Sequence, residues 1–332
     1  MIDKTYEKKE GIEVIYLAGG CFWGVERLMQ VINGVVKTTT GYANGKEGAI
    51  ATYQEVCSGK TDFRETVRVE YDPKIVSLET LLFAFFKVID PTLINRQGHD
   101  VGTQYQSGIY FIDDKTKETV EYVASIERLR SKKFYVEIKE LVNFYDAEDY
   151  HQDYLIKNPN GYCHINLKEI QEAAQIKIDA GKYPRPDESV IKQRLTVEQY
   201  QVTQEKKTEA PFFNPYHALD DQGIYVDIVT GEPLFSSSDK YISSCGWPSF
   251  AKGIDPNAIV ERDDRSLFAK RTEVLSRSGN THLGHVFDND PESPSGIRYC
   301  INSASLQFIP KEEMAEKGYG YLLDQSVDNK EE

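Results

Sequence analysis

The feature that most constrains the fold is a proline-bearing polar segment, "YPRPDES" at residues 183–189, because it separates two stretches of different texture. Before it, helical apolar periodicity is mixed with alternating strands, whereas after it short strands are separated by frequent Gly, Pro, Ser and Asp. The chain of 332 residues is long enough for two domains, since one domain usually spans about 100–200 residues. The sequence therefore predicts two domains, each with its own core.

In the N-terminal stretch, "IEVIYLAGG" predicts a strand that ends in a glycine turn, and "GVERLMQVI" predicts a helix directly after it. "ETVRVEYDP" alternates as a half-buried strand, and "SLETLLFAFFKVID" predicts a helix capped by Ser77. "SGIYFID" and "YVEI" predict further strands on either side of the charged helix "KTKETVEYVASIERLRSKK". Strands and helices that are mixed without strict alternation favour an α+β domain.

The C-terminal stretch begins after a helical segment, "EIQEAAQIKIDAGK", that we expect to end near Gly181. One short helix, "TVEQYQVTQ", precedes strands such as "GIYVDI" and "SLQFIP", and this pattern predicts a mainly β domain. The acidic end "SVDNKEE" is expected to be frayed. We predict the following division: residues 1–175 form the first domain, 176–193 a linker, 194–315 the second domain and 316–332 a C-terminal tail.

The formal net charge of −14 disfavours phosphate backbones and anionic membrane surfaces, so neither a nucleic acid nor a membrane is expected as a partner. The opening "MIDKTYEKKEGIEVIY" lacks the apolar core of a secretory signal, and no stretch of about 18 apolar residues occurs. We therefore expect a soluble, unexported, cytoplasmic protein.

Five scattered cysteines are too few for a disulfide framework in a chain of this length, and none forms a C-x-x-C pair. They are therefore either packing thiols or individually reactive ones. Cys21 lies where the predicted strand meets the predicted helix, and the partial positive charge of a helix N-terminus favours a thiolate. Its flanking glycines allow close backbone approach, and Phe22 and Trp23 either form an apolar wall for a methyl group or pack in the core.

The segment "GGCFWG" resembles the signature of the methionine sulfoxide reductase A family, and the similarity continues through "TYQEVCSGKTDFRETVRVEYDP", "HDVGTQYQSGIY", "YDAEDYHQDYL" and "NPNGYC". It covers residues 12 to 170 and implies a ferredoxin-like α+β domain. The resemblance makes Cys21 the nucleophile that attacks the sulfoxide sulfur and becomes a sulfenic acid. It makes Glu65 the group that donates a proton to the sulfoxide oxygen.

Other positions follow from the same resemblance. Tyr53, Tyr105 and Asp100 match the groups that bind the sulfoxide oxygen, and Cys163 matches the cysteine that resolves the sulfenic acid as a disulfide. Cys57 is expected to be structural. The chain departs from the family at Phe63, where relatives usually carry histidine two residues before the glutamate, so the hydrogen bonds around Glu65 are expected to differ.

Three later segments, "KYISSCGWPSF", "HLGHVFDND" and "GIRYCINSASLQF", resemble the methionine sulfoxide reductase B family, which has a mainly β fold and reduces the opposite sulfoxide epimer. The resemblance makes Cys300 the nucleophile, Cys245 the resolving cysteine and Trp247 the ring that receives the substrate methyl. The remaining matched positions are His282, His285 and Asn302, which would donate to the sulfoxide oxygen, and Arg298, which would favour the thiolate.

Two positions depart from the pattern of that family. The aspartate partner of Arg298 would fall at Asn289, with Asp288 and Asp290 as neighbouring substitutes. Relatives that hold a structural zinc use two C-x-x-C pairs. Here those positions hold Asp227, Thr230, Ser276 and Gly279. We therefore expect a domain that folds without zinc, and histidines that serve the substrate and not a metal.

The sequence thus predicts a bifunctional reductase of free or protein-bound methionine sulfoxide that uses thioredoxin or a similar dithiol and needs no bound cofactor. The S epimer is expected at the first site and the R epimer at the second. Two alternatives stay open at this point. A thiol peroxidase or disulfide exchanger would use the same cysteines but leaves Glu65, Trp247 and the paired histidines unexplained. A non-catalytic module that binds oxidised methionine would show no turnover.

Overall fold

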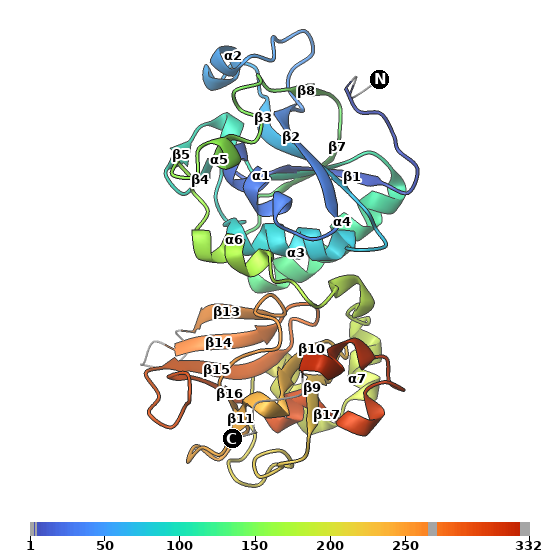
Figure 1. Ribbon diagram of the computed structural model, residues 1–332, viewed down its shortest axis with the longest axis vertical. Coiled ribbons are helices and arrows are strands. Elements are labelled where there is room, and N and C mark those ends of the chain that lie inside the picture. Colours follow the sequence, from blue (N-terminus) through green and yellow to red (C-terminus); the bar gives the residue numbers. More distant parts are fainter. Residues whose placement is uncertain (1–2, 4, 265–270, 326–332) are drawn as a thin grey trace. The chain divides into compact units, whose positions relative to one another are not determined.

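A computed structural model describes residues 3, 5–264 and 271–325 of the chain (Figure 1). It divides into two compact units, Met1–Gly181 and Lys182–Glu332. The predicted frayed end at residues 326–332 lies outside the described residues. Among the residues that are described, no helix is long and apolar enough to cross a membrane.

The first unit is built on a six-stranded sheet in the order β7-β6-β1-β3-β2-β8. Its strands are β1 Glu13–Ala18, β2 Val35–Ala43, β3 Arg64–Tyr71, β6 Gly108–Phe111, β7 Glu137–Glu140 and β8 Phe144–Asp146. All neighbours are antiparallel except β6 and β7. The central order β6-β1-β3-β2, with a helix after β1 and another after β3, is the ferredoxin-like arrangement. The prediction of an α+β domain is confirmed.

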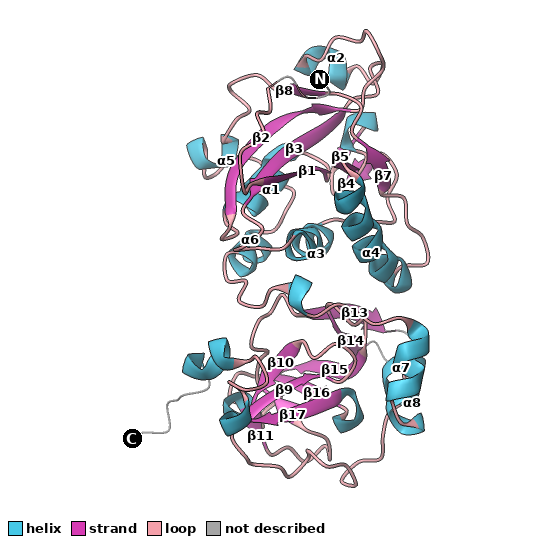
Figure 2. Cartoon of the chain, turned by 90° about the vertical axis from the view of Figure 1, so that its right-hand side faces the viewer, coloured by secondary structure: helices cyan, strands magenta, loops and turns pink. Residues whose placement is uncertain are grey.

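Helices cover one face of this sheet, as Figures 1 and 2 show. They are α1 Phe22–Gln30, α3 Leu78–Val88, α4 Asp114–Arg130 and α6 Leu167–Ala173. The alternation of β1 places Ile15 and Leu17 in the core against Val25 of α1 and Leu81 of α3. Ser77 caps α3 as predicted, because its hydroxyl accepts the backbone N–H of Thr80 at 3.2 Å.

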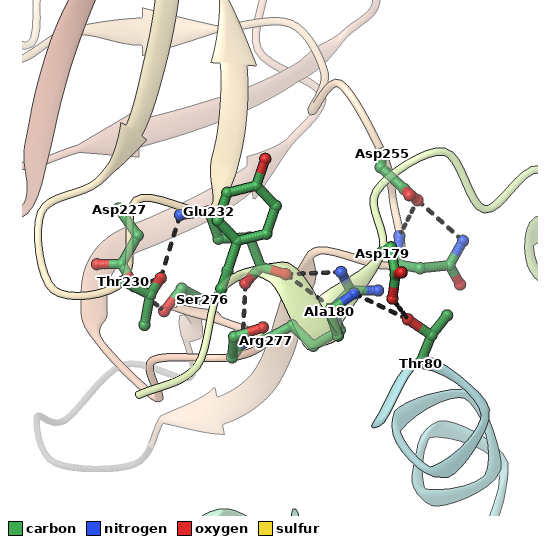
Figure 3. A network of polar contacts seen from close by, with 12 residues as sticks. Thr80, Asp179, Ala180, Asp227, Thr230, Glu232, Asp255, Ser276 and Arg277 are labelled. Carbon is green, nitrogen blue, oxygen red and sulfur yellow. Dashed lines mark hydrogen bonds and ion pairs between the residues drawn. The ribbon is translucent and has the colours of Figure 1, made fainter. Parts of the chain in front are cut away.

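The helical segment expected to end near Gly181 ends earlier, at Ala173. The chain then turns so that Ile178 is fully buried and Asp179 accepts a hydrogen bond from the Thr80 hydroxyl at 2.8 Å (Figure 3). The backbone N–H of Ala180 also donates to that hydroxyl at 2.8 Å. These contacts with the start of α3 replace the hydrogen bonds of further helical turns.

Shorter elements complete the first unit. They are α2 Tyr53–Cys57, β4 Arg96–Gln97, β5 Asp100–Val101, η1 Thr103–Tyr105, α5 Tyr154–Lys157 and η2 Ala180–Lys182. The pair β4 and β5 forms a two-stranded sheet of its own, and η1 follows it directly. This arrangement brings the "HDVGTQY" segment to one edge of the domain.

The second unit is mainly β, as predicted, and all its strand pairs are antiparallel. One sheet has the order β10-β9-β17, with β9 Gly223–Asp227, β10 Pro233–Ser236 and β17 Leu306–Pro310. The other has the order β11-β12-β16-β15-β14-β13. Its strands are β11 Lys240–Tyr241, β12 Ser249–Phe250, β13 Ile259–Asp264, β14 Arg271–Ser276, β15 His282–Asp288 and β16 Ile297–Ile301.

The second unit also has short helical segments, before, between and after its strands. They are α7 Glu188–Arg194, α8 Val197–Glu205, η3 Ser237–Asp239, η4 Ser303–Ser305, η5 Lys311–Glu313 and η6 Gly320–Gln325. Helix α7 covers the end of the segment predicted as a linker and extends one residue past it, and Ile191 of this helix is buried. Within the segment predicted as a tail, Leu322 is buried in a cluster with Met314 and Ile309.

Candidate active sites

The first site is built where β1 meets α1. Cys21 is the residue immediately before α1, and its side chain is 6% exposed. Gly20 has a positive φ of 84°, and a Cβ there would lie 2.6 Å from the Gln97 side chain. Both the backbone conformation and the lack of space therefore require glycine at position 20. This structural requirement explains the glycine before Cys21 without any role in substrate approach.

Glu65 reaches the same point from β3. Its carboxylate accepts the backbone N–H of Phe22 at 3.1 Å, and the residue is 2% exposed. Burial raises the pKa of Glu65 to about 8, with a further contribution from the charge of Asp100. The carboxyl therefore keeps its proton at neutral pH, as a proton donor must.

The electrostatic expectation for Cys21 is wrong. The helix N-terminus was expected to favour the thiolate, but burial and the charge of Glu65 raise the pKa of Cys21 above its ordinary value. The cost of removing a thiolate from water outweighs the hydrogen bond from the backbone N–H of Trp23, which lowers the pKa of Cys21. Because Glu65 is itself protonated at neutral pH, the resting site holds a thiol beside a carboxylic acid.

Groups that could bind an oxygen surround these two side chains. Burial raises the pKa of Tyr53 and of Tyr105. The charge of Cys57 and a hydrogen bond to it raise the pKa of Tyr53 further, and the charges of Glu65 and Cys21 raise the pKa of both phenols. Both phenols are therefore protonated donors at neutral pH. Asp100 accepts the hydroxyl of Tyr162 at 3.0 Å. The structure thus brings together all the predicted polar residues of the first site.

Phe22 and Trp23 join an aromatic cluster beside Cys21. The ring of Trp23 stacks on Tyr154 with centroids 3.7 Å apart. The His151 ring lies 5.0 Å from Phe22 and 4.8 Å from Tyr53 between centroids. Such a cluster can receive an apolar methyl group while the phenols face an oxygen.

Cys163 is partly buried and packs against the same core as Cys21. The next residue, His164, donates from Nε2 to the carbonyl of Gly19 at 2.9 Å. This bond ties the segment that carries Cys163 to the segment that carries Cys21. Cys57 is exposed at the end of α2.

Phe63, where the chain departs from the family pattern, packs against apolar neighbours, and its ring has no group that could hydrogen-bond to Glu65. The Phe63 ring is buried and lies edge-on to Tyr145, with centroids 5.7 Å apart. It also covers Gly45, where a Cβ would meet the ring at 2.4 Å. The ring therefore fills an apolar space beside the site, and Phe22 supplies the hydrogen bond to Glu65.

Three residues of the first site carry no role in the sequence interpretation: His151, Tyr162 and His164. Each lies inside or beside a matched motif, "YHQDYL" or "NPNGYC", so the motifs located them without indicating what they touch. The signal that could have found them is their polarity among apolar and aromatic neighbours.

The second site lies on the larger sheet of the second unit. Cys300 on β16 pairs in register with Ser249 of β12 on one side and His285 of β15 on the other. The sulfur atoms of Cys245 and Cys300 are 3.4 Å apart, and both thiols are free. The two predicted redox cysteines therefore already face each other.

This pair can carry one shared thiolate. The hydrogen bond from Cys300 lowers the pKa of Cys245 to about 4, and the same bond raises the pKa of Cys300. Arg298 adds a cation that favours the negative charge on either sulfur. Its guanidinium is held by the Asp290 carboxylate. Asp290 therefore replaces the aspartate that the pattern placed at Asn289.

The two histidines are each held by a carboxylate. His282 Nδ1 donates to Glu273 at 2.8 Å, and His285 Nε2 donates to Asp264 at 2.9 Å. Burial raises the pKa of Glu273, but hydrogen bonds from His282 and Lys206 bring it down to about 2. Burial lowers the pKa of His285. Carboxylate partners of this kind fix which ring nitrogen carries the proton.

Trp247 and Asn302 complete the site. The indole N–H of Trp247 donates to the carbonyl of Glu209 at 3.2 Å, and the Asn302 side-chain amide donates to the carbonyl of Leu283 at 2.9 Å. The residues predicted for the second site therefore lie on two adjoining strands, β15 and β16, in the turn directly after β16, which holds Asn302, and in the loop before β12. The carboxylates of Glu273, Asp264 and Glu209 carry no role in the sequence interpretation, because nothing in the sequence shows what they contact.

The residues at the zinc positions do not fit a zinc ion. Asp227 accepts the hydroxyls of Thr230 and Ser276, both at 2.9 Å (Figure 3), and that of Thr281 at 3.1 Å. A Cβ at Gly279 would lie 2.2 Å from the Asp227 carboxylate. The four positions therefore hold one carboxylate, two hydroxyls and a glycine, without the thiolates and imidazoles that structural zinc requires. Among the described residues, no group of three or more His, Cys, Asp or Glu side chains could hold a metal ion.

Fold and sites together define a thiol oxidoreductase with two separate cysteine centres. Residues 13–182 match the family model of peptide methionine sulfoxide reductase, and residues 195–310 match that of the SelR domain. The chain belongs to the peptide methionine sulfoxide reductase family, as a fusion of an A-type N-terminal domain and a B-type, SelR C-terminal domain. It is an enzyme with peptide-methionine (S)-S-oxide and (R)-S-oxide reductase activities. The alternative of a non-catalytic module is thereby set aside.

Solved structures similar to this chain match about half of it. Reduced Mxr1 from Saccharomyces cerevisiae is 39% identical over 50% of this chain and 98% of its own, with a TM-score of 0.47. Methionine sulfoxide reductase A of Corynebacterium diphtheriae is 39% identical over 47% of this chain and 79% of its own, with a TM-score of 0.42. Mxr1 in complex with Trx2 is 29% identical over 46% of this chain and 92% of its own, with a TM-score of 0.33.

Proposed function

We propose that the Cys21 site reduces the S epimer of methionine sulfoxide and the Cys300 site the R epimer, each through a sulfenic acid and an intramolecular disulfide. The observation that carries this proposal is the convergence, at each site, of a nucleophilic cysteine, proton donors and an aromatic methyl seat. One chiral pocket cannot present these three groups correctly to both hands of a sulfoxide. Two sites on unrelated folds can.

At the first site, the sulfur of Cys21 bonds to the sulfoxide sulfur while Glu65 donates its proton to the sulfoxide oxygen. The oxygen then moves to the Cys21 sulfur: a new S–O bond forms on Cys21 while the substrate sulfur loses both its S–O bond and its bond to Cys21. Methionine leaves, and Cys21 is a sulfenic acid. The neutral carboxyl of Glu65 is suited to this step because burial raises its pKa to about 8. The Cys21 proton restores Glu65, so the step balances without an added proton.

The thiol of Cys163 then attacks the sulfenic acid, a disulfide forms and water leaves. At the second site Cys300 is the nucleophile and Cys245 the resolving cysteine, and His282, His285 and Asn302 surround the oxygen. For the attack, the Cys300 proton passes to the Cys245 sulfur 3.4 Å away, and Arg298 stabilises the thiolate that is then on Cys300. We propose that residues 1–175 form the domain of the first site and that residues 194–315 form the domain of the second.

Two electrons must then reach each disulfide. We propose thioredoxin or a similar dithiol as donor, acting on oxidised proteins and free methionine sulfoxide in the cytoplasm. The pairing of each nucleophile with a second cysteine supports this proposal, because a disulfide is the species that a dithiol reduces. Mxr1, which has been crystallised with Trx2, is a relative of the first domain.

The test is disulfide mapping after one turnover. The reduced chain is mixed with pure S or pure R sulfoxide, alkylated and digested. We expect a disulfide between Cys21 and Cys163 with the S epimer and one between Cys245 and Cys300 with the R epimer. Cys57 should stay alkylated and serves as the internal control. A disulfide that includes Cys57, or the same disulfide with both epimers, would contradict the assignment.

A further inference from the structure

A short segment before β9 contacts both halves of the second site. Residues 209–214, here called the strap, run along the loop that carries Cys245 and Trp247. Besides the bond from the indole of Trp247 to Glu209, the backbone N–H of Phe212 and the side chain of Asn214 donate to the carbonyl of Gly246 at 2.8 and 2.9 Å. The strap therefore fixes the loop that precedes β12.

The same segment contacts the chain just after Cys300. The backbone N–H of Glu209 donates to the Asn302 side-chain oxygen at 3.1 Å. The Glu209 carboxylate accepts the backbone N–H groups of Ser303 and Ala304, the latter at 2.8 Å. Glu209 thus contacts three parts of the site: its N–H binds Asn302, its carbonyl binds Trp247, and its side chain binds the backbone after Asn302.

These contacts set the orientation of the Asn302 amide. Its oxygen is occupied by the N–H of Glu209, and one of its two amide hydrogens is donated to Leu283. One hydrogen is left for a sulfoxide oxygen. If the amide turned over, its NH₂ group would face the N–H of Glu209, two donors against each other. The contact with Glu209 therefore keeps the NH₂ group of Asn302, and not its oxygen, toward the substrate.

The Glu209 side chain is what holds this arrangement. The residue is 7% exposed, and burial raises the pKa of its carboxyl. Hydrogen bonds from two consecutive N–H groups favour the ionised form, and hydrogen bonds to a charged group are stronger than neutral ones. A buried carboxylate anchored in this way keeps its own backbone beside Trp247 and Asn302.

We propose that Glu209 is a positioning residue for reduction of the R sulfoxide, which fixes the methyl-receiving ring of Trp247 and the oxygen-binding amide of Asn302 relative to each other. Glu209 touches neither substrate nor the reacting sulfur, so it acts through these two side chains. This inference rests on the proposed function of the second site. It adds a residue from outside the three motifs that define that site.

The test compares Glu209→Gln with wild type in the full chain, using a chemical dithiol as reductant. The S-epimer activity of each sample is the internal control, and Glu312→Gln, an exposed glutamate of the same domain, is the matched control. For the R epimer we expect kcat/KM to fall about tenfold, with part of the loss in KM because Trp247 is displaced. S activity should stay within about twofold of wild type.

Trp247 emission gives a second readout. Trp23 and Trp247 are the only tryptophans, so the Trp23→Phe chain reports Trp247 alone. In that chain Glu209→Gln should shift the emission to longer wavelength and increase quenching by acrylamide. If Glu209→Gln fails to fold, Glu209→Asp, which keeps the charge on a shorter side chain, replaces it. The same two quantities are measured: kcat/KM for the R epimer and the emission of Trp247.

An R-epimer kcat/KM within about twofold of wild type, or an unchanged Trp247 emission, would overturn the positioning role. Absence of R activity from the wild type would refute the proposed function instead, and the emission of Trp247 would still decide whether Glu209 positions the ring.

Discussion

Asp227 is expected to stabilise the second domain in the place where relatives use zinc. Its buried carboxylate accepts the hydroxyls of Thr230, Ser276 and Thr281, and the backbone N–H of Val229 at 3.0 Å. These donors come from the turn after β9 and from the β14–β15 connection, so the carboxylate joins two parts of the chain. Replacement by alanine removes the shared acceptor of four donors.

The expected loss follows from these bonds. A hydrogen bond to a charged group contributes about 1.5–3 kcal/mol, and a hydroxyl can rotate toward another acceptor, so the total is smaller than four such terms. We expect Asp227→Ala to lower the free energy of unfolding by about 3–5 kcal/mol, as when a buried charged network is broken. Asp227→Asn keeps the size and one acceptor, so about half of that loss is expected.

The assay is urea unfolding of the full chain, with Trp247 emission in the Trp23→Phe background as the probe. With a slope of about 2 kcal/mol per molar urea, Asp227→Ala should move the midpoint of the second domain by about 2 M. Asp221→Ala, an exposed aspartate of the same domain, is the control and should leave the midpoint unchanged. A strong zinc chelator should not affect the wild type.

A midpoint shift below about 0.5 M for Asp227→Ala would refute this reasoning. A chelator that lowers the wild-type midpoint would show that a metal stabilises the domain after all.

Three further predictions concern catalysis. Cys163→Ser and Cys245→Ser should each spare the first turnover of their own epimer but slow cycling with thioredoxin; unchanged thioredoxin-supported rates would remove the resolving role. Glu65→Gln keeps the shape of the side chain but has no proton to give, so single-turnover reduction of the S epimer should slow by about 10²–10⁴-fold while R reduction is unchanged; a loss below about fivefold would mean that another group supplies the proton. Asp290→Asn releases Arg298 and should raise the pH at which the Cys245–Cys300 pair is alkylated by iodoacetamide, with Asp288→Asn as the control; identical pH profiles would show that Asp290 does not act through Arg298.

The sequence predicted those parts of the fold that local patterns determine. The alternation in β1, the apolar face of α3 and its Ser77 cap are properties of neighbouring residues, and the structure has each of them. The early end of α6 at Ala173 could not be predicted in this way. The residues beyond it make long-range contacts instead, such as the hydrogen bond from Thr80 to Asp179, about a hundred positions apart, which no local pattern indicates.

The same distinction holds for the sites. Motifs located the cysteines, aromatic rings and oxygen-binding groups, because their residue types are unusual in their immediate surroundings. The pKa of Cys21 was predicted with the wrong sign, because the depth of burial and the distance to Glu65 are tertiary properties. The choice of Asp290 over Asp288 as the partner of Arg298 depends on a turn in which Asn289 has a positive φ of 58°.

The central claim is that one chain divides the two sulfoxide epimers between two cysteines. The most direct measurement supplies pure S and pure R methionine sulfoxide separately to the wild type, Cys21→Ser and Cys300→Ser, with a chemical dithiol as reductant. We predict that Cys21→Ser loses S activity alone and that Cys300→Ser loses R activity alone. Both single variants retaining both activities, or either variant losing both while still folded, would contradict the claim.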